Sequence, residues 1–188
     1  MSDQYHHGNL KNTLLEAAVS LISQDGLENL SLRRLAAQCG VSHNAIYRHF
    51  DGKEQLIDAC RTYVMRELTG TLEQALSGLD ESQPQTMEQL GMAYLDFYMQ
   101  NPTYFSAYFR NATQRLTFSM QPIEGNYPPF SVFCRVALAI AEGQGIPQDE
   151  VQRRLLRYWV MLNGMFAMWI SSNVDLPEDW KTCLKNGF

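Results

Sequence analysis

The sequence has few of the features that mark membrane, secreted or metal-binding proteins. No apolar stretch approaches the roughly 18 residues of a membrane span. Residues 1–11 are polar and contain no apolar core of a secretion signal. The four cysteines, Cys39, Cys60, Cys134 and Cys183, lie far apart and form no CxxC pair, which disfavours a disulfide framework and a zinc site. We therefore expect a cytoplasmic protein with reduced thiols, no membrane anchor, no metal and no cofactor.

The sequence also lacks the residue groupings that catalysis requires. It contains no HExxH or ExxH pair and no glycine-rich phosphate loop. All four histidines fall within the first 50 residues, away from the more apolar second half of the chain. These absences argue against a helical enzyme, and we expect no enzymatic activity.

The apolar residues recur at the spacing of α-helices, and no β-alternation of any length is present. With 188 residues, of which 45% are hydrophobic, the chain can form a sizeable core. We predict an all-α fold of about nine helices, with an irregular connection at 120–129. The expected helices lie at about 10–25, 32–39, 43–50, 53–77, 86–101, 104–109, 130–142 and 148–172, with a short helix or loose tail after 175.

Residues 31–50 have the pattern of a helix-turn-helix. Gly40 supplies the turn, Val41 is apolar and lies under it, and Ser42 is a good N-cap for the second helix. That helix is expected to expose side chains of the kind that reach bases and phosphates: His43, Asn44, Tyr47 and Arg48, with His49 at its end. On this pattern alone, a DNA reader and an ordinary glycine-linked helix pair both remain open.

Charge is unevenly distributed along the chain. The formal net charge is −5, which by itself argues against a nucleic-acid partner. Residues 1–66, however, contain seven basic and seven acidic side chains, and residues 31–53 alone carry a net charge of +3. Residues 67–188 contain eight basic and thirteen acidic side chains, so the whole negative excess lies outside the proposed DNA-reading segment. This asymmetry favours an electrostatically oriented DNA binder.

The segment "SLRRLAAQCGVSHNAIYRHFDGKEQLIDA" resembles the N-terminal domain of TetR/AcrR-family transcriptional regulators. The preceding "YHHGNLKNTLLEAAVSLISQDGLENL" is similar to the first helix of that family. The resemblance covers about residues 5–62, and the remainder is similar in outline to the family's regulatory domain. Within it, "RYWVMLNGMFAMW" resembles the subgroup with a Trp-His-Gly pattern, but Asn163 stands at the place of the histidine.

The resemblance implies a DNA-binding domain at 1–52 and an effector-binding and dimerisation domain at 53–188, linked by the helix from about 53. It implies that Tyr47, His49 and Lys53 contact phosphates and that the exposed positions of the second helix choose bases. The implied DNA-binding residues are Ser31, Arg33, Ser42, His43, Asn44, Ala45, Tyr47, Arg48, His49 and Lys53.

Residues 86–169 are rich in methionine and aromatic side chains, which suit an apolar or aromatic effector. At each position an ordinary core role remains the alternative to a cavity lining. The candidate ligand-binding residues are Tyr63, Met92, Tyr98, Met99, Tyr104, Phe105, Tyr108, Phe118, Trp159, Met165, Phe166 and Trp169. The resemblance also implies a homodimer joined by helices at 129–143 and 148–172.

Together these features predict a dimeric transcription regulator. We expect a repressor that an effector releases from a pseudo-palindromic double-stranded DNA operator. An architectural DNA-binding protein of the same fold, without an effector, is the alternative.

Overall fold

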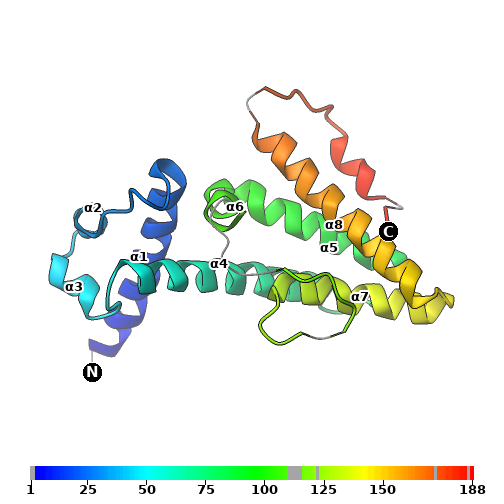
Figure 1. Ribbon diagram of the computed structural model, residues 1–188, viewed down its shortest axis with the longest axis horizontal. Coiled ribbons are helices and arrows are strands. Elements are labelled where there is room, and N and C mark those ends of the chain that lie inside the picture. The colour runs from blue at the N-terminus through cyan, green and yellow to red at the C-terminus, as the bar shows by residue number, and fades with distance from the viewer. Residues whose placement is uncertain (1–2, 110–115, 122, 172, 186) are drawn as a thin grey trace. The chain divides into compact units, whose positions relative to one another are not determined.

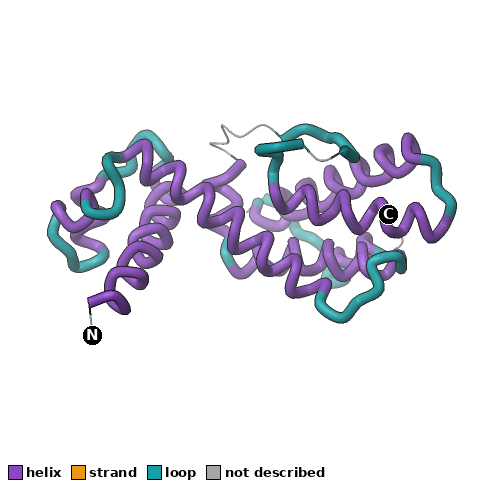
Figure 2. The backbone as a smooth tube through the Cα atoms, turned by 90° about the horizontal axis from the view of Figure 1, so that it is seen from below, coloured by secondary structure: helices purple, strands orange, loops and turns teal. Residues whose placement is uncertain are grey.

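The structure is a computed structural model that describes residues 3–109, 116–121, 123–171, 173–185 and 187–188. Over these residues it is built from eight α-helices and one short 3-10 helix, with no strand (Figures 1 and 2). The predicted all-α class is confirmed, and the predicted count of about nine is close. The helices are α1 (Asp3–Asp25), α2 (Leu32–Gln38), α3 (His43–Tyr47), α4 (Lys53–Leu76), α5 (Pro84–Gln100), α6 (Pro102–Phe109), α7 (Pro128–Gln144), α8 (Gln148–Ile170) and η1 (Trp180–Leu184).

Four helices begin earlier than the sequence pattern predicts. Helix α1 begins at Asp3, and the other three begin at a proline: α5 at Pro84, α6 at Pro102 and α7 at Pro128. Proline suits the first helical position because its missing N–H would have no partner there and its fixed φ already matches the helix. The irregular connection predicted at 120–129 is therefore shorter at its C-terminal end.

The chain divides into two compact units, which are described separately. The head unit comprises Met1–Val64 with Thr103–Ala112, and the body unit comprises Met65–Pro102 with Thr113–Phe188. Helix α4 contributes residues to both units. The domain boundary predicted between residues 52 and 53 stays a prediction.

The head unit is held together by one hydrophobic cluster. Helices α1 to α4 contribute fully buried side chains, among them Leu14, Leu35, Ile46 and Leu56. Burial of this kind contributes about 1.5–3 kcal/mol for each large aliphatic side chain. The cluster fixes the two short helices α2 and α3, which are too short to be stable alone.

Helix α6 belongs to the head unit through Tyr104. Its ring lies 6.2 Å from the ring of Tyr63 on α4, in an edge-to-face arrangement. The Tyr63 hydroxyl donates a hydrogen bond to Glu16 Oε1 on α1 at 2.9 Å. Burial is the main cause that raises the pKa of Tyr63, so this hydroxyl stays protonated and can donate. The three residues thus join α1, α4 and α6.

An aromatic core fills the body unit, where α5, α7 and α8 pack against one another. Tyr94 on α5 lies at its centre, with ring centroids 5.1 Å from Tyr98, 5.9 Å from Phe133 and 5.4 Å from Trp159. The Tyr94 hydroxyl donates to Asn163 Oδ1 at 2.9 Å, and the Asn163 amide donates to the Trp159 carbonyl at 2.8 Å. Asn163 therefore satisfies a polar group of the core. The assignment to the Trp-His-Gly subgroup stays a prediction.

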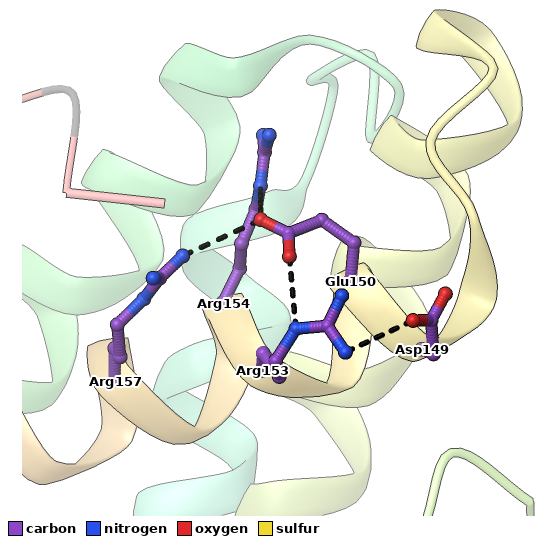
Figure 3. A network of polar contacts seen from close by, with 5 residues as sticks. All are labelled: Asp149, Glu150, Arg153, Arg154 and Arg157. Atoms are coloured by element: carbon purple, nitrogen blue, oxygen red, sulfur yellow. Dashed lines mark hydrogen bonds and ion pairs between the residues drawn. The ribbon is translucent and has the colours of Figure 1, made fainter.

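The first turns of α8 carry a dense network of ion pairs (Figure 3). Glu150 accepts hydrogen bonds from Arg154 at 2.9 Å, Arg153 at 3.0 Å and Arg157 at 3.5 Å, and Arg153 also pairs with Asp149 at 2.9 Å. The bonds from Arg154 and then Arg153 hold the pKa of Glu150 below its usual value. Carboxylates at a helix N-terminus also interact favourably with the helix dipole. The network therefore supports the start of α8 at neutral pH, and this support is lost as pH falls through the lowered pKa of Glu150.

The cysteine side chains are free thiols. Burial raises the pKa of Cys60 and of Cys134 to about 12, so both remain protonated near neutrality. Among the described residues, no cluster of metal-ligating side chains could hold an ion. In the same residues, no helix combines the length and apolar content that a bilayer span needs.

Candidate nucleic-acid interface

The turn between α2 and α3 has the glycine-dependent geometry that the sequence predicted. Gly40 has a φ of +66°, a conformation that favours glycine. Its N–H donates to the Ala37 carbonyl at 3.2 Å, and the Val41 N–H donates to the Ala36 carbonyl at 3.0 Å. These bonds satisfy the last carbonyls of α2. Val41 then packs against the head cluster, which sets where α3 begins.

The start of α2 carries two adjacent arginines, and only one of them forms an ion pair with a described residue. Ser31 caps the helix by accepting the Arg34 N–H at 3.3 Å. The Arg34 guanidinium forms an ion pair with Asp25. Arg33 is exposed and forms no ion pair with any residue that the structure describes. Of these two arginines, Arg33 is therefore the one available to a phosphate.

Helix α3 has a buried back and an exposed front. Ile46 is fully buried, and Phe50, just after the helix, is nearly so. The side chains of His43, Asn44 and Tyr47 are exposed, so they form the front. Tyr47 retains 47% of its surface, which is high for an aromatic side chain.

Ser42 occupies the N-cap position of α3, but its side chain makes no capping hydrogen bond. This corrects the capping role expected for its hydroxyl. The Ser42 carbonyl already accepts the Ala45 N–H at 2.9 Å, and that N–H is one of the two donors that a cap side chain normally uses. The Ser42 side chain is exposed beside the front of α3.

All ten predicted DNA-binding residues lie in the head unit, but they are not equally exposed. Lys53 donates from Nζ to the Glu28 carbonyl at 2.6 Å, a bond that occupies one of its three ammonium donors. His49 is half-buried, with its ring 6.3 Å from that of Phe50. The exposed residues are Ser31, Arg33, Ser42, His43, Asn44, Tyr47 and Arg48, and the half-buried residues are Ala45, His49 and Lys53.

The predicted ligand-binding residues are divided between the two units. Tyr63, Tyr104 and Phe105 lie in the head unit. In the body unit Tyr98, Trp159 and Phe166 are buried, whereas Met92, Met99, Phe118, Met165 and Trp169 are half-buried. The side chain of Tyr108 lies outside the described residues. The buried three pack against other aromatic rings, and a cavity lined by this set stays a prediction.

A groove of about 440 Å³ does occur in the body unit, with a different lining. It runs between the 119–126 segment and α7, and includes Met120, Ile123, Cys134, Leu138 and Glu142. None of these residues was a predicted ligand contact. The sequence carries no signal for Met120 and Ile123, because an irregular segment has no periodicity from which its inward side can be read. Cys134, Leu138 and Glu142 share one face of α7 at i, i+4 spacing.

An outward apolar face on α7 and α8 was also missed. Within the range 129–143, where the resemblance implies a dimer interface, Phe133 and Ala137 are buried in the body unit. The exposed large apolar side chains are Leu138 on α7, at 38% exposure, and Leu156, Val160, Met168 and Ile170 on α8, at 43%, 60%, 48% and 40%. The i, i+4 spacing of Leu156 and Val160 indicates one face of α8, but it does not show whether that face is exposed.

Two family models match the chain and together cover most of it. Residues 14–60 match the model described as "Bacterial regulatory proteins, tetR family". Residues 87–187, more than half of the chain, match "Tetracyclin repressor-like, C-terminal domain". The first match contains α2, the turn and α3, and the second contains α7, α8 and most of α5.

Similar individual proteins agree with these two family matches. An uncharacterized HTH-type transcriptional regulator of Mycobacterium tuberculosis is 21% identical over 169 residues, which cover 88% of this chain and 72% of the regulator. The nucleoid occlusion factor SlmA of Actinobacillus pleuropneumoniae is 29% identical over 90 residues, 47% of this chain and 44% of that factor. The crystal structure of the TetR-family transcriptional regulator PfmR from Thermus thermophilus superposes with a TM-score of 0.63 at 19% identity, covering 93% of this chain and 98% of that one. At this identity the structural match shows the fold alone.

Proposed function

Because the chain belongs to the TetR family of bacterial regulatory proteins, we propose that it is a homodimeric, cytoplasmic DNA-binding repressor without enzymatic activity, released from its operator by a small apolar or aromatic effector. The observation that carries this proposal is the front of α3. Its polar side chains are exposed while Ile46 anchors its back in the head cluster. A short helix held in this way can enter the major groove and offer side chains to base edges.

The exposed cations flank α3. Arg33 at the start of α2 and Arg48 directly after α3 are both exposed, and neither forms an ion pair within the described chain. They are therefore available to the duplex, where Arg33 would hold a phosphate and Arg48 would reach a base. Phosphate contacts fix the register, and base contacts choose the sequence.

A homodimer is supported by the outward apolar face of the body unit. Val160 and Leu156 are one helical turn apart on α8, and both are exposed. A two-fold axis along this face would bury both side chains in each of the two protomers. Two heads related by that axis would read half-sites about one DNA turn apart.

Val160→Glu is expected to weaken the dimer at least about 100-fold, because burying a valine contributes about 1.5–3 kcal/mol and the symmetry doubles the loss. Sedimentation velocity over a range of protein concentrations measures the change. Val174→Glu is the matched control: Val174 is also exposed but follows the end of α8. If Val160→Glu remains as dimeric as Val174→Glu, the interface lies elsewhere.

Release by an effector requires a path to the reading helices, and the Tyr104–Tyr63–Glu16 contacts offer one within the head unit. A ligand that displaces α6 would disturb Tyr63 and, through its 2.9 Å hydrogen bond, α1. The ligand must bind one arrangement of the head more tightly than the other, since equal affinity shifts no equilibrium.

An architectural DNA-binding protein without an effector is the second candidate function. It is favoured by the match to a nucleoid occlusion factor over 47% of the chain and by the close ring contacts in the aromatic core of the body unit. Such a protein would bind DNA specifically but would not be released by a small molecule.

Selection from a randomised duplex pool tests the proposal. The purified protein should enrich an inverted repeat with half-sites about 10 base pairs apart. A panel of apolar and aromatic compounds is then added to the bound duplex. Release by one of them supports the repressor, and unchanged binding with every compound supports the architectural protein. No enriched sequence would refute both.

A further inference from the structure

The exposed ring of Tyr47 on the reading surface is free to move unless a neighbouring side chain restrains it. Tyr47 is 47% exposed, and its hydroxyl is expected to meet a DNA phosphate. An exposed side chain moves among rotamers, and fixing it on binding lowers the affinity. A phosphate contact also constrains where the hydroxyl must lie. A neighbour that restrains the ring before DNA arrives would therefore strengthen binding.

His43 is that neighbour. The two residues are four positions apart on α3, a spacing that places their side chains on the same helix face. Their ring centroids lie 5.2 Å apart with planes at 79°, an edge-to-face arrangement of the kind that stabilises aromatic pairs. Ile46, next to Tyr47, is turned into the core and leaves the outer face of α3 to this pair.

We propose that His43 is a positioning residue, which holds the Tyr47 ring for its phosphate contact, and that base choice on α3 falls to Asn44 and Arg48. The inference rests on the proposed function, because it assumes that α3 lies in the major groove. It assigns His43 a role different from the base contact that the family resemblance implies.

The chemistry of the remaining front residues fits this division. Asn44 is exposed, and a carboxamide can pair with adenine through one donor and one acceptor. Arg48 is exposed and free of ion pairs within the described chain, and a guanidinium pairs with guanine in the same bidentate way. Tyr47 at a phosphate would carry no sequence information, so the residue that supports it should affect affinity without affecting sequence preference.

The experiment compares four variants with the wild-type protein: His43→Ala, His43→Phe, Tyr47→Ala and the double variant His43→Ala/Tyr47→Ala. Each is tested by selection from a randomised duplex pool and by titration of the selected duplex. His43→Ala should weaken binding about 5- to 30-fold, since each dimer has two such rings to fix, and should select the same sequence as wild type. His43→Phe keeps an aromatic ring at this position and should bind within about 3-fold of wild type. In the Tyr47→Ala background, His43→Ala should cause no further loss.

Three results would overturn the inference while leaving the proposed function intact: a changed base preference in His43→Ala, an equal loss in His43→Phe, or a full additional loss in the Tyr47→Ala background. A wild-type protein that selects no sequence would overturn both. Asn44→Ala is the positive control for base reading, because it should change the selected sequence. Thermal melting of each variant checks that the exposed substitutions leave the head folded.

Discussion

Replacing both Arg33 and Arg48 by alanine is expected to weaken binding to the selected operator by about 1000-fold. Both side chains are exposed and have no ion-pair partner among the described residues, so each can give a charge-assisted contact to DNA. Such contacts contribute about 1.5–3 kcal/mol each, and a dimer loses four of them. Because the effects are not additive, about 4 kcal/mol is a modest expectation, which corresponds to about 1000-fold.

The single variants separate the two roles. Arg33→Ala should weaken binding to all duplexes similarly and should make the slope of log K against log salt shallower by about 1.8, since two phosphate contacts are lost per dimer. Arg48→Ala should instead relax the preference at one position of each half-site. Fluorescence anisotropy at several salt concentrations measures both.

Arg34→Ala is the matched control for this prediction. Arg34 neighbours Arg33 on α2, but its guanidinium is engaged with Asp25. We expect its loss to change operator affinity less than about 3-fold, because exposed ion pairs contribute only about 0–1 kcal/mol to the fold. Equal effects of Arg33→Ala and Arg34→Ala would show that general charge, and not this placement of Arg33, determines binding.

Gly91→Ala is expected to lower the free energy of unfolding of the body unit by about 2–4 kcal/mol, because the new Cβ would overpack the core and displace a buried hydrogen bond. A Cβ at this position would overlap the Tyr158 hydroxyl, and it would lie 3.0 Å from the ring carbon Cζ of Tyr158 and 3.3 Å from Leu162 Cδ2. Tyr158 is buried, and its hydroxyl donates to the Met87 carbonyl at 2.9 Å. Overpacking costs about 1–3 kcal/mol and a lost buried hydrogen bond about 1–3 kcal/mol, which exceeds the gain of about 1 kcal/mol from alanine in a helix.

Two further variants test the cause of this loss. Gly70→Ala, in the exposed part of α4, has no atom within 4 Å of the new Cβ and should stabilise the protein by about 0.5–1 kcal/mol. Tyr158→Phe removes the overlapping hydroxyl, so it should destabilise less in the Gly91→Ala background than in the wild type. Urea unfolding followed by circular dichroism gives each value. If Gly91→Ala is as stable as wild type, α5 and α8 do not approach as closely as described.

The sequence predicts more of the structure of the head unit than of the body unit. Glycine at residue 40 and the apolar residues around it determine a local turn, so Gly40, Val41 and the inward-facing Ile46 follow from pattern and spacing. The pattern does not predict side-chain contacts between residues that are far apart in the sequence. The ion pair of Arg34 with Asp25 and the bond from Lys53 to the Glu28 carbonyl depend on how α1, α2 and α4 pack.

In the body unit the aromatic pattern predicted the fold, but it did not show which residues line a cavity. Tyr98, Trp159 and Phe166 were candidates for a cavity, and all three are buried among other rings. Periodicity shows which face of a helix is apolar, but the partner of that face, whether another helix, a ligand or a second chain, depends on tertiary packing. For the same reason, the outward-facing Leu156 and Val160 could not be distinguished from core residues.

Hydrogen–deuterium exchange on the protein with and without its selected operator shows which segment contacts DNA. We expect DNA to slow amide exchange mainly between Ser31 and Lys53, over α2, the turn at Gly40 and α3. Slowing confined to α7 and α8, with unchanged exchange from Ser31 to Lys53, would contradict this expectation.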